Sequence, residues 1–235
     1  SIVEDWEYNS FGQMTAHVLP DNGSAHRRRD EYTYYTAGPQ LGYLEREIVD
    51  ATGYDLTTTH EYDLVGNTTR VIDPLGHDSR SIYNQLNQVV RSISREVTSG
   101  GGVRYETDTF YDANDNVVRS DVQNKNESGV LQPNTHFTTI HEYDILNYRV
   151  RTCSESGDFV VPSGQITCAG LPDSEFIVTE SEYDANRNRT LFRNGEAANG
   201  NQPFNTVTTL YDERDLVFRE IRAAGHPDQT TTQYD

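Results

Sequence analysis

A four-residue stretch with the side chains of an active site occurs twice in this 235-residue chain. Two stretches, His60-Glu61-Tyr62-Asp63 and His141-Glu142-Tyr143-Asp144, each combine an imidazole, two carboxylates and a phenol. Such groups transfer protons or bind metal ions in many enzymes. They also serve as turn and packing residues, which every unit of a repeating fold needs. The surrounding sequence has to decide between these two interpretations.

A tyrosine followed by aspartate or asparagine recurs along the chain. With Tyr35 included as a degenerate copy, nine tyrosines mark the repeat: Tyr8, Tyr35, Tyr62, Tyr83, Tyr111, Tyr143, Tyr183, Tyr211 and Tyr234. At the position of His60 and His141, other copies have Ser81, Thr109 and Thr209. Chemistry tied to one site would not be spread over many degenerate copies, so we interpret HEYD as a structural repeat. We expect no enzyme activity and no catalytic residues.

Each tyrosine lies between two stretches that favour β-strands. A threonine-rich run precedes it, and turn-forming Asn, Gly and Asp residues follow it. An arginine beside a mostly apolar residue lies eight positions after the tyrosine in five copies, at Arg70, Arg91, Arg119, Arg151 and Arg219. Each unit is therefore predicted to be a β-hairpin whose turn lies just after the Tyr-Asp pair. The expected packing and turn-closing residues are Tyr62, Asp63, Tyr83, Tyr111, Asp112, Tyr143, Asp144, Tyr183, Asp184, Tyr211 and Asp212.

The composition favours strands and excludes some partners. Only 34% of the residues are hydrophobic, yet the chain has 15 tyrosines, and a core rich in Tyr, Thr and Val is typical of β-sheets. The formal net charge of −18 argues against nucleic acid and anionic membranes, which attract basic surfaces. No apolar run approaches the roughly 18 residues of a membrane span. We expect an all-β protein without nucleic-acid binding or membrane insertion.

The segment from Tyr62 to Glu96, "YDLVGNTTRVIDPLGHDSRSIYNQLNQVVRSISRE", resembles the YD repeats of the bacterial Rhs family. Similar repeats are found in teneurins and in toxin-complex C components. The resemblance extends over nearly the whole chain. It implies an array of antiparallel β-hairpins that stack into a spiral sheet and form part of a hollow shell or barrel. We expect residues 1–235 to be a single array of this kind, excised from a longer chain.

The resemblance also implies a function. Rhs-type shells enclose a cargo, usually a C-terminal toxin polypeptide of the same protein, so the first hypothesis is a structural segment that encapsulates or delivers a toxin. The alternative is an extracellular adhesion module that contacts a glycan or receptor. Both place the protein outside the cell or at its surface, with neighbouring repeats as the first partner. Some toxin-bearing members carry paired DPxG motifs for self-cleavage; here "DPLG" occurs once, at residues 73–76, and reads as a turn.

Cys153 and Cys168 are the two cysteines of the chain and bracket a polar segment. A local disulfide between them would close a loop of about 15 residues and contribute roughly 3 kcal/mol, and it would imply an oxidising compartment. The alternative is two unrelated thiols. No CxxC pair or paired histidines accompany them, so a zinc site is not expected.

Two segments begin like calcium-binding loops. "DANDN" at residues 112–116 and "DANRN" at residues 184–188 match D-x-N-x-N, but the sixth position, a glycine in an EF-hand, is Val117 or Arg189. We predict turns here, with a weak calcium site as the alternative, and no cofactor.

Several polar segments are predicted to be loops at the sheet edge. They are "TSGGGV" at 98–103, "NKNESGVLQPN" at 124–134, the segment between the cysteines, and "RNGEAANGNQP" at 193–203. Since loops carry recognition more often than strands do, any binding surface is expected there. The basic cluster "HRRRDE" at 26–31 is predicted to be a solvated loop, with a protease-sensitive tip as the alternative.

Overall fold

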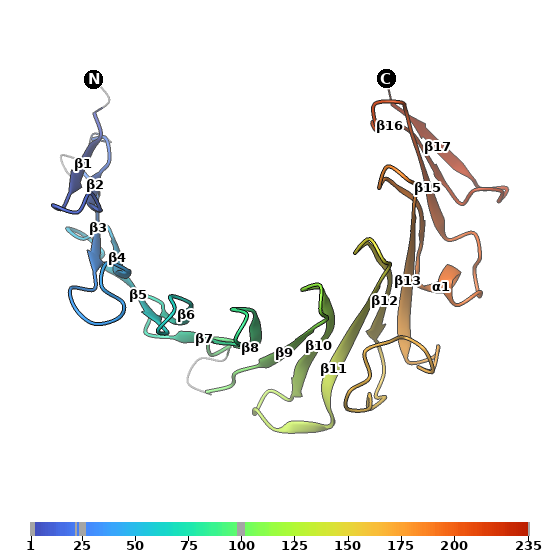
Figure 1. The fold of residues 1–235 in the computed structure, drawn as a ribbon, viewed down its shortest axis with the longest axis horizontal. Helices are drawn as coiled ribbons and strands as arrows, with labels where there is room; N and C mark the ends of the chain where they lie inside the picture. Colours follow the sequence, from blue (N-terminus) through green and yellow to red (C-terminus); the bar gives the residue numbers. More distant parts are fainter. Residues whose placement is uncertain (1–2, 22, 24–26, 98–101, 235) are drawn as a thin grey trace. The chain divides into compact units, whose positions relative to one another are not determined.

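The computed structural model describes residues 3–21, 23, 27–97 and 102–234. In these ranges the chain forms 17 β-strands and one short helix, and every strand pairing with a defined register is antiparallel. The predicted all-β array of hairpins is therefore confirmed (Figure 1).

The chain divides into two compact units. The first consists of Ser1–Glu106 with Glu127–Gly129. Within it each strand pairs with the next one along the chain. Its strands are β1 (Asp5–Tyr8), β2 (Met14–Val18), β3 (Arg29–Tyr34), β4 (Leu44–Val49), β5 (Leu56–Tyr62), β6 (Thr68–Ile72), β7 (Asp78–Tyr83) and β8 (Val89–Ile93).

The second unit consists of Thr107–Asn126 with Val130–Asp235. It repeats the same pairing of consecutive strands. Its elements are β9 (Glu106–Tyr111), β10 (Val117–Lys125), β11 (Leu131–Tyr143), β12 (Arg149–Glu155), β13 (Phe176–Tyr183), β14 (Arg189–Arg193), α1 (Gly195–Ala198), β15 (Thr206–Tyr211), β16 (Val217–Arg222) and β17 (Thr230–Gln233).

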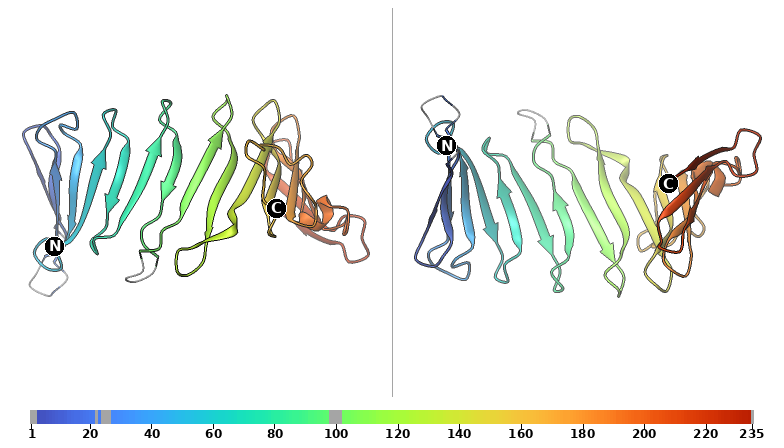
Figure 2. Two further views of the ribbon diagram at one scale, coloured as in Figure 1. Left: turned by 90° about the horizontal axis from the view of Figure 1, so that it is seen from below. Right: turned by 90° about the horizontal axis from the view of Figure 1, so that it is seen from above.

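Because consecutive strands are antiparallel, the connections within each unit alternate between two edges of the sheet (Figure 2). The turns that follow odd-numbered strands lie on one edge, which we call the tyrosine edge. They comprise residues 9–13, 35–43, 63–67 and 84–88 in the first unit and 112–116, 144–148, 184–188 and 212–216 in the second. The other connections form the opposite edge, which we call the loop edge.

Each hairpin has a β-bulge beside its tyrosine. Glu61 faces Arg70 and Tyr62 faces Thr68, so Thr69 is an extra residue on β6. The same shift occurs in the other hairpins that close on the tyrosine edge. The arginine eight residues after the tyrosine therefore faces the residue that precedes the tyrosine, and its neighbour is the bulge residue. Bulges increase the local twist of a sheet, so every hairpin is more strongly twisted next to its tyrosine.

The largest apolar core lies in the second unit. Six of the eleven buried apolar residues among those described form one cluster. Ile140, Cys153 and Val178 are direct cross-strand partners on β11, β12 and β13. The connection at residues 156–175 supplies Val161 and Cys168 to the same cluster, so this connection covers that face of the sheet (Figure 1).

Three predicted loops differ from the structure. In "HRRRDE", residues 29–31 belong to β3, because Arg29 lies between Glu7 and Glu31 and pairs with both. In "NKNESGVLQPN", β10 extends to Lys125 and β11 begins at Leu131, which leaves a short turn. The third segment, at 193–203, contains α1. In "TSGGGV", residues 98–101 lie outside the described residues.

No helix among the described residues combines the length and the apolar character needed to cross a bilayer.

Candidate functional site: the tyrosine turns

The aspartate or asparagine after seven of the tyrosines closes its turn through its own side chain and backbone. In the turn at 63–67, the backbone N–H of Asp63 donates to the carbonyl of Asn67 at 2.9 Å. Oδ1 of Asp63 accepts from the backbone N–H groups of Val65 at 3.0 Å and Asn67 at 2.9 Å. The same arrangement is built on Asn9, Asn84, Asp112, Asp144, Asp184 and Asp212.

The single "DPLG" segment forms this turn as well. Oδ1 of Asp73 accepts from the backbone N–H groups of Leu75 at 2.9 Å and His77 at 3.0 Å. The turn joins β6 to β7 and so lies on the loop edge, without a tyrosine before it. Asp73 thus has a turn-closing role like that of the other aspartates.

The fourth residue of each five-residue turn has a left-handed backbone. Glycine fills this position in some turns, with φ of 98° at Gly66. Asn, Asp or Arg fills it in others: Asn87, Asp115, Asn147, Arg187 and Asp215. A turn followed by one left-handed residue is a common hairpin connection, and Asn and Asp tolerate that conformation better than other non-glycine residues. Arg187, at φ 77°, is the residue least suited to it.

Hydrogen bonds keep the turn carboxylates charged. The side-chain amides of Asn67 and Asn116 hold the pKa of Asp63 and Asp112 below the usual range. The backbone N–H of Asn188 and the guanidinium of Arg214 do the same for the pKa of Asp184 and Asp212. These carboxylates are acceptors within turns and are poorly suited to donate a proton near neutral pH.

In five hairpins the tyrosine hydroxyl ties the hairpin to the one before it. It donates to the backbone carbonyl of the first residue of the preceding even-numbered strand. These bonds join Tyr34 to Met14 at 2.7 Å, Tyr83 to Thr68 at 2.9 Å, Tyr143 to Val117 at 3.1 Å, Tyr183 to Arg149 at 3.1 Å and Tyr211 to Arg189 at 3.2 Å. Because the acceptor is backbone, any side chain is compatible at that position.

In the second hairpin the equivalent tyrosine is Tyr34, one residue before the Tyr35 chosen by sequence alignment. Tyr34 ends β3, whereas the backbone N–H of Tyr35 begins the turn by donating to Tyr43. The Tyr35 hydroxyl instead donates to the carbonyl of His60 at 2.9 Å. The longer turn at 35–43 hides this register in the sequence.

The residues of the two HEYD stretches have structural partners and lie in different units. The ring of Tyr62 packs 5.2 Å from the ring of Tyr43, measured between centroids. Burial raises the pKa of Tyr62 and Tyr143 and lowers the pKa of His141, whose Nδ1 lies 3.0 Å from the Thr152 hydroxyl. Within the described ranges, no cluster of three His, Cys, Asp or Glu side chains is arranged to hold a metal ion.

The acids of HEYD also have distinct partners. Glu61 forms an ion pair with Arg70 at 3.0 Å. Oε1 of Glu142 accepts from the backbone N–H of Cys168 at 2.8 Å, which attaches the connection at 156–175 to β11. A disulfide joins Cys168 to Cys153 on β12 and holds the same connection. The repeated stretch therefore has one local role in its turn and a different contact at each glutamate.

A buried ion cluster in the first unit was missed by sequence reasoning. Asp78, 5% exposed, accepts from Nε of Arg70 at 2.8 Å and Nε of Arg80 at 2.6 Å. Arg104 donates to its other carboxylate oxygen and, at 2.6 Å, to its backbone carbonyl. The guanidinium of Arg80 holds the pKa of Asp78 far below its usual range, and Arg70 and Arg104 contribute. The alternation of Asp78 and Arg80 on one strand is the one local signal for this cluster.

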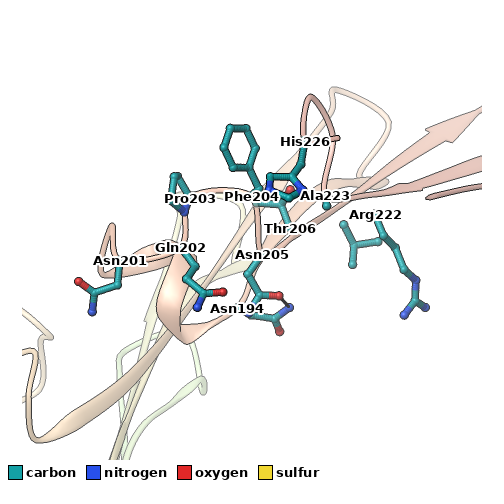
Figure 3. A pocket seen from close by; sticks show the side chains of 11 residues that line it. Asn194, Asn201, Gln202, Pro203, Phe204, Asn205, Thr206, Arg222, Ala223 and His226 are labelled. Carbon is teal, nitrogen blue, oxygen red and sulfur yellow. Dashed lines mark hydrogen bonds between the residues drawn. The ribbon is translucent and has the colours of Figure 1, made fainter. Parts of the chain in front are cut away.

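An open pocket of about 590 Å³ lies on the loop edge of the second unit (Figure 3). It is lined by Asn194, residues 201–207, Arg222, Ala223 and His226. The ring centroids of Phe204 and His226 are 5.2 Å apart, and Nδ2 of Asn194 donates to Oδ1 of Asn205 at 3.0 Å. The pocket thus offers an aromatic surface and side-chain amides. Part of its lining belongs to the predicted loop at 193–203.

No protein-family model and no curated protein matches the chain in sequence. Solved structures do match. The chain superposes on the structure titled "Crystal Structure of TcdB2-TccC3-TEV" with a TM-score of 0.52 and 12% identity, over 96% of this chain and 12% of that chain. At this identity the match shows the fold, and it confirms the YD-repeat resemblance at that level. The chain thus shares the fold of that structure, an all-β array of hairpins.

Two further structures match with lower scores. "Crystal Structure of TcdB2-TccC3" gives a TM-score of 0.40 at 11% identity, over 99% of this chain and 15% of that chain. A porin-like protein from Bacteroides uniformis gives 0.41 at 14% identity, over 97% of this chain and 87% of that chain. Neither score is high enough to support an inference about this chain.

Proposed function

We propose that this chain is a structural segment of an Rhs-type shell that encapsulates or delivers a toxin polypeptide. The observation that carries the proposal is the repeated bond from the tyrosine hydroxyl to the backbone of the preceding hairpin. Because this bond needs only a backbone carbonyl as its acceptor, hairpins of different sequence can be added one after another. The wall of a shell requires such continuous addition. The fold shared with the TcdB2-TccC3-TEV structure supports the same role.

The proposed role is structural, without catalysis by this segment. The acids of the repeated turns are occupied as hydrogen-bond acceptors, as at Asp63 and Asp112. The excess of negative charge, −18 for the chain, would favour a basic cargo, because opposite charge attracts over several ångströms even in salt.

We place the protein outside the cell or at its surface. The disulfide between Cys153 and Cys168 supports this location, since disulfides form and persist mainly in oxidising compartments.

Intact mass spectrometry of the full-length protein that contains this segment tests the proposal. The protein is measured under native and then denaturing conditions, without reduction. We expect a C-terminal polypeptide that stays bound in the native spectrum and is released on denaturation. One continuous chain with no retained fragment would contradict encapsulation.

The pocket on the loop edge favours a second candidate, a carbohydrate-contact surface. Aromatic faces stack on sugar rings, and amides bond to sugar hydroxyls; Phe204, Asn194 and Asn205 offer these groups. Binding to a glycan array is expected to be lost in Phe204→Ala and kept in the control Phe11→Ala, whose ring is 86% exposed on the tyrosine edge. Equal binding by both variants, or none by the unaltered protein, would reject this candidate.

A further inference from the structure

Neighbouring turns on the tyrosine edge touch each other in a regular way. We call the last residue of a turn its exit residue, and the residue before it the left-handed residue. The exit residue of one turn contacts the left-handed residue of the next, and we call each such pair a turn couple. Within the two units the couples are Gln13–Gly42, Tyr43–Gly66, Asn67–Asn87, Asn116–Asn147, Tyr148–Arg187 and Asn188–Asp215.

Three of the couples are hydrogen bonds from an asparagine amide. Nδ2 of Asn67 donates to Oδ1 of Asn87 at 2.9 Å. Asn116 donates to Asn147 at 3.0 Å, and Asn188 donates to Asp215 at 2.8 Å. Each acceptor has a left-handed backbone, where glycine would be the least strained residue. Asn or Asp there keeps the conformation accessible and adds an acceptor for the neighbouring turn.

These couples explain the motif that resembles a calcium loop. In "DANDN" the third residue, Asn114, also donates to Oδ1 of Asn147, at 3.0 Å. In "DANRN" the third residue, Asn186, donates to Oδ1 of Asp215 at 3.1 Å. Both asparagines of each motif thus point to one acceptor in the next hairpin, and the first aspartate of each motif closes its own turn.

Where the exit residue is not asparagine, the left-handed residue differs as well. The hydroxyl of Tyr43 lies over Gly66, and a β-carbon on Gly66 would be 2.7 Å from it. The amide of Gln13 donates to the backbone carbonyl of Gly42 at 2.7 Å. The guanidinium carbon of Arg187 lies 6.0 Å from the ring centroid of Tyr148, within cation–π distance.

We propose that the turn couples specify which hairpin is accepted as the neighbour of which. The ladder bonds and the tyrosine bonds use backbone acceptors and recur in the same form, so they do not distinguish one neighbour from another. The couples are of four kinds, and exchanging members between kinds is unfavourable: the hydroxyl of Tyr43 would lie 2.7 Å from a β-carbon at position 66, and an asparagine exit residue finds no side-chain acceptor on Gly66. This inference is independent of what the array encloses.

A double-mutant cycle tests the proposal in the folded chain. Tyr148→Asn and Arg187→Asn are made singly and together, since the double variant recreates the asparagine couple found at 67 and 87. The cycle cancels the strain that Arg187→Asn relieves by itself. Multiplying the effects of the two single variants gives the unfolding equilibrium constant expected without an interaction. We expect the double variant to have a constant about two- to fivefold lower than this value.

The control cycle joins members of different couples, Tyr148→Asn with Asp215→Asn. Its effects are expected to combine without an interaction. If the 148–187 cycle is also purely additive, the couples carry no specificity and the proposal is overturned.

Hydrogen exchange gives a second, local readout. Asn67→Ala is expected to speed amide exchange in the neighbouring turn at 84–88 as well as in its own turn. The matched control is His77→Ala: His77 is the last residue of the Asp73 turn on the loop edge, and its Nδ1 lies 3.7 Å from Asp73 Oδ2. Faster exchange confined to residues 63–67 in Asn67→Ala would show that the asparagine acts only within its own turn and would overturn the proposal.

Discussion

At the scale of single residues, two side chains of the repeat have different structural roles. The aspartate or asparagine closes the turn of its own hairpin, as Asp63 does. The tyrosine bonds to the hairpin before it, as Tyr143 does to Val117. The aspartate of both HEYD stretches has the same turn-closing role as the aspartate or asparagine of copies that have serine or threonine in place of histidine. Their histidines are therefore not required by the turn.

Removing one tyrosine hydroxyl should weaken the array measurably. Tyr143→Phe loses the bond to the Val117 carbonyl, 3.1 Å long, and keeps the ring. We expect a loss of about 1 kcal/mol in the free energy of unfolding, measured by urea denaturation. Tyr54→Phe serves as the control, because Tyr54 is 84% exposed and should cost nothing. Equal stability of both variants would mean that the hydroxyl bond contributes little.

The turn carboxylates predict an acid-sensitive stability. The pKa values of Asp63, Asp112, Asp184 and Asp212 are lower in the folded protein than their usual value, so the unfolded chain binds protons more tightly. Their contribution is complete above about pH 5 and is lost as the pH falls through about 4 and below. Urea midpoints between pH 7 and 3 measure this loss. The decline should be shallower in Asp112→Asn; an identical decline would contradict the role of Asp112.

At the scale of elements, contacts outside the repeat hold particular strands. Asp78 joins β6 and β7 to the segment after β8 through Arg70, Arg80 and Arg104. In the second unit, Arg119 is 6% exposed and donates to the carbonyls of Pro162 and Gln165 at 2.9 and 3.0 Å. Among the described residues each of these contacts occurs once, and they distinguish hairpins that the repeat alone would make alike.

Neutralising Asp78 should destabilise the first unit. Asp78→Asn removes the negative charge that pairs with three guanidinium groups, and it leaves these positive groups close together. We expect a loss of about 2 kcal/mol, less than for a fully buried pair because the arginines are partly exposed. Urea denaturation measures it, with the exposed Asp173→Asn as control. If the loss is no greater than for the control, hydration of the three guanidinium groups offsets the loss of their ion pairs with Asp78.

Reducing the disulfide should destabilise the second unit. The Cys153–Cys168 bond spans 15 residues, and opening a loop of this length costs up to roughly 3 kcal/mol by chain entropy. We expect a lower guanidinium midpoint with dithiothreitol, together with faster proteolysis within residues 156–167. Cys153→Ser with Cys168→Ser, measured without reductant, should reproduce the lower midpoint. An unchanged midpoint in both experiments would mean that Glu142 and the apolar cluster hold the connection alone.

At the scale of the whole molecule, the chain has few buried apolar side chains and a large negative charge. Eleven apolar residues are buried among those described, while the net charge is −18. Such a charge opposes compaction through repulsion between distant carboxylates. The short ion pairs around Asp78 and Arg119 act in the opposite sense and are less accessible to salt.

Moderate salt should therefore stabilise the protein. Raising NaCl from 10 to 150 mM shortens the screening length from about 30 Å to about 8 Å, which weakens distant repulsion more than the short pairs. We expect the melting temperature, followed by circular dichroism, to rise by about 2 °C or more. Choline chloride should act equally if screening is the cause. A fall in melting temperature would show that the local ion pairs dominate.

Much of the fold was predictable from the sequence because its main features are local. A turn is closed by residues within five positions of one another, and strand alternation is visible over five or six residues. The spacing of Tyr62, Tyr83 and Tyr111 was therefore sufficient to predict hairpins and the place of their turns. The same locality explains the error at Tyr35: the longer turn at 35–43 breaks the spacing, and the register then depends on the bond from Tyr34 to Met14.

The sequence by itself determined the all-β class, the repeating hairpin and the residues that close its turns. The tertiary structure decided which residues of separate hairpins meet. The couple of Asn67 with Asn87, the bond of Arg104 to Asp78, and the packing of residues 156–175 on one face each join positions distant in sequence. No local pattern specifies such contacts, because they exist only once neighbouring strands have paired in register and brought the side chains within reach.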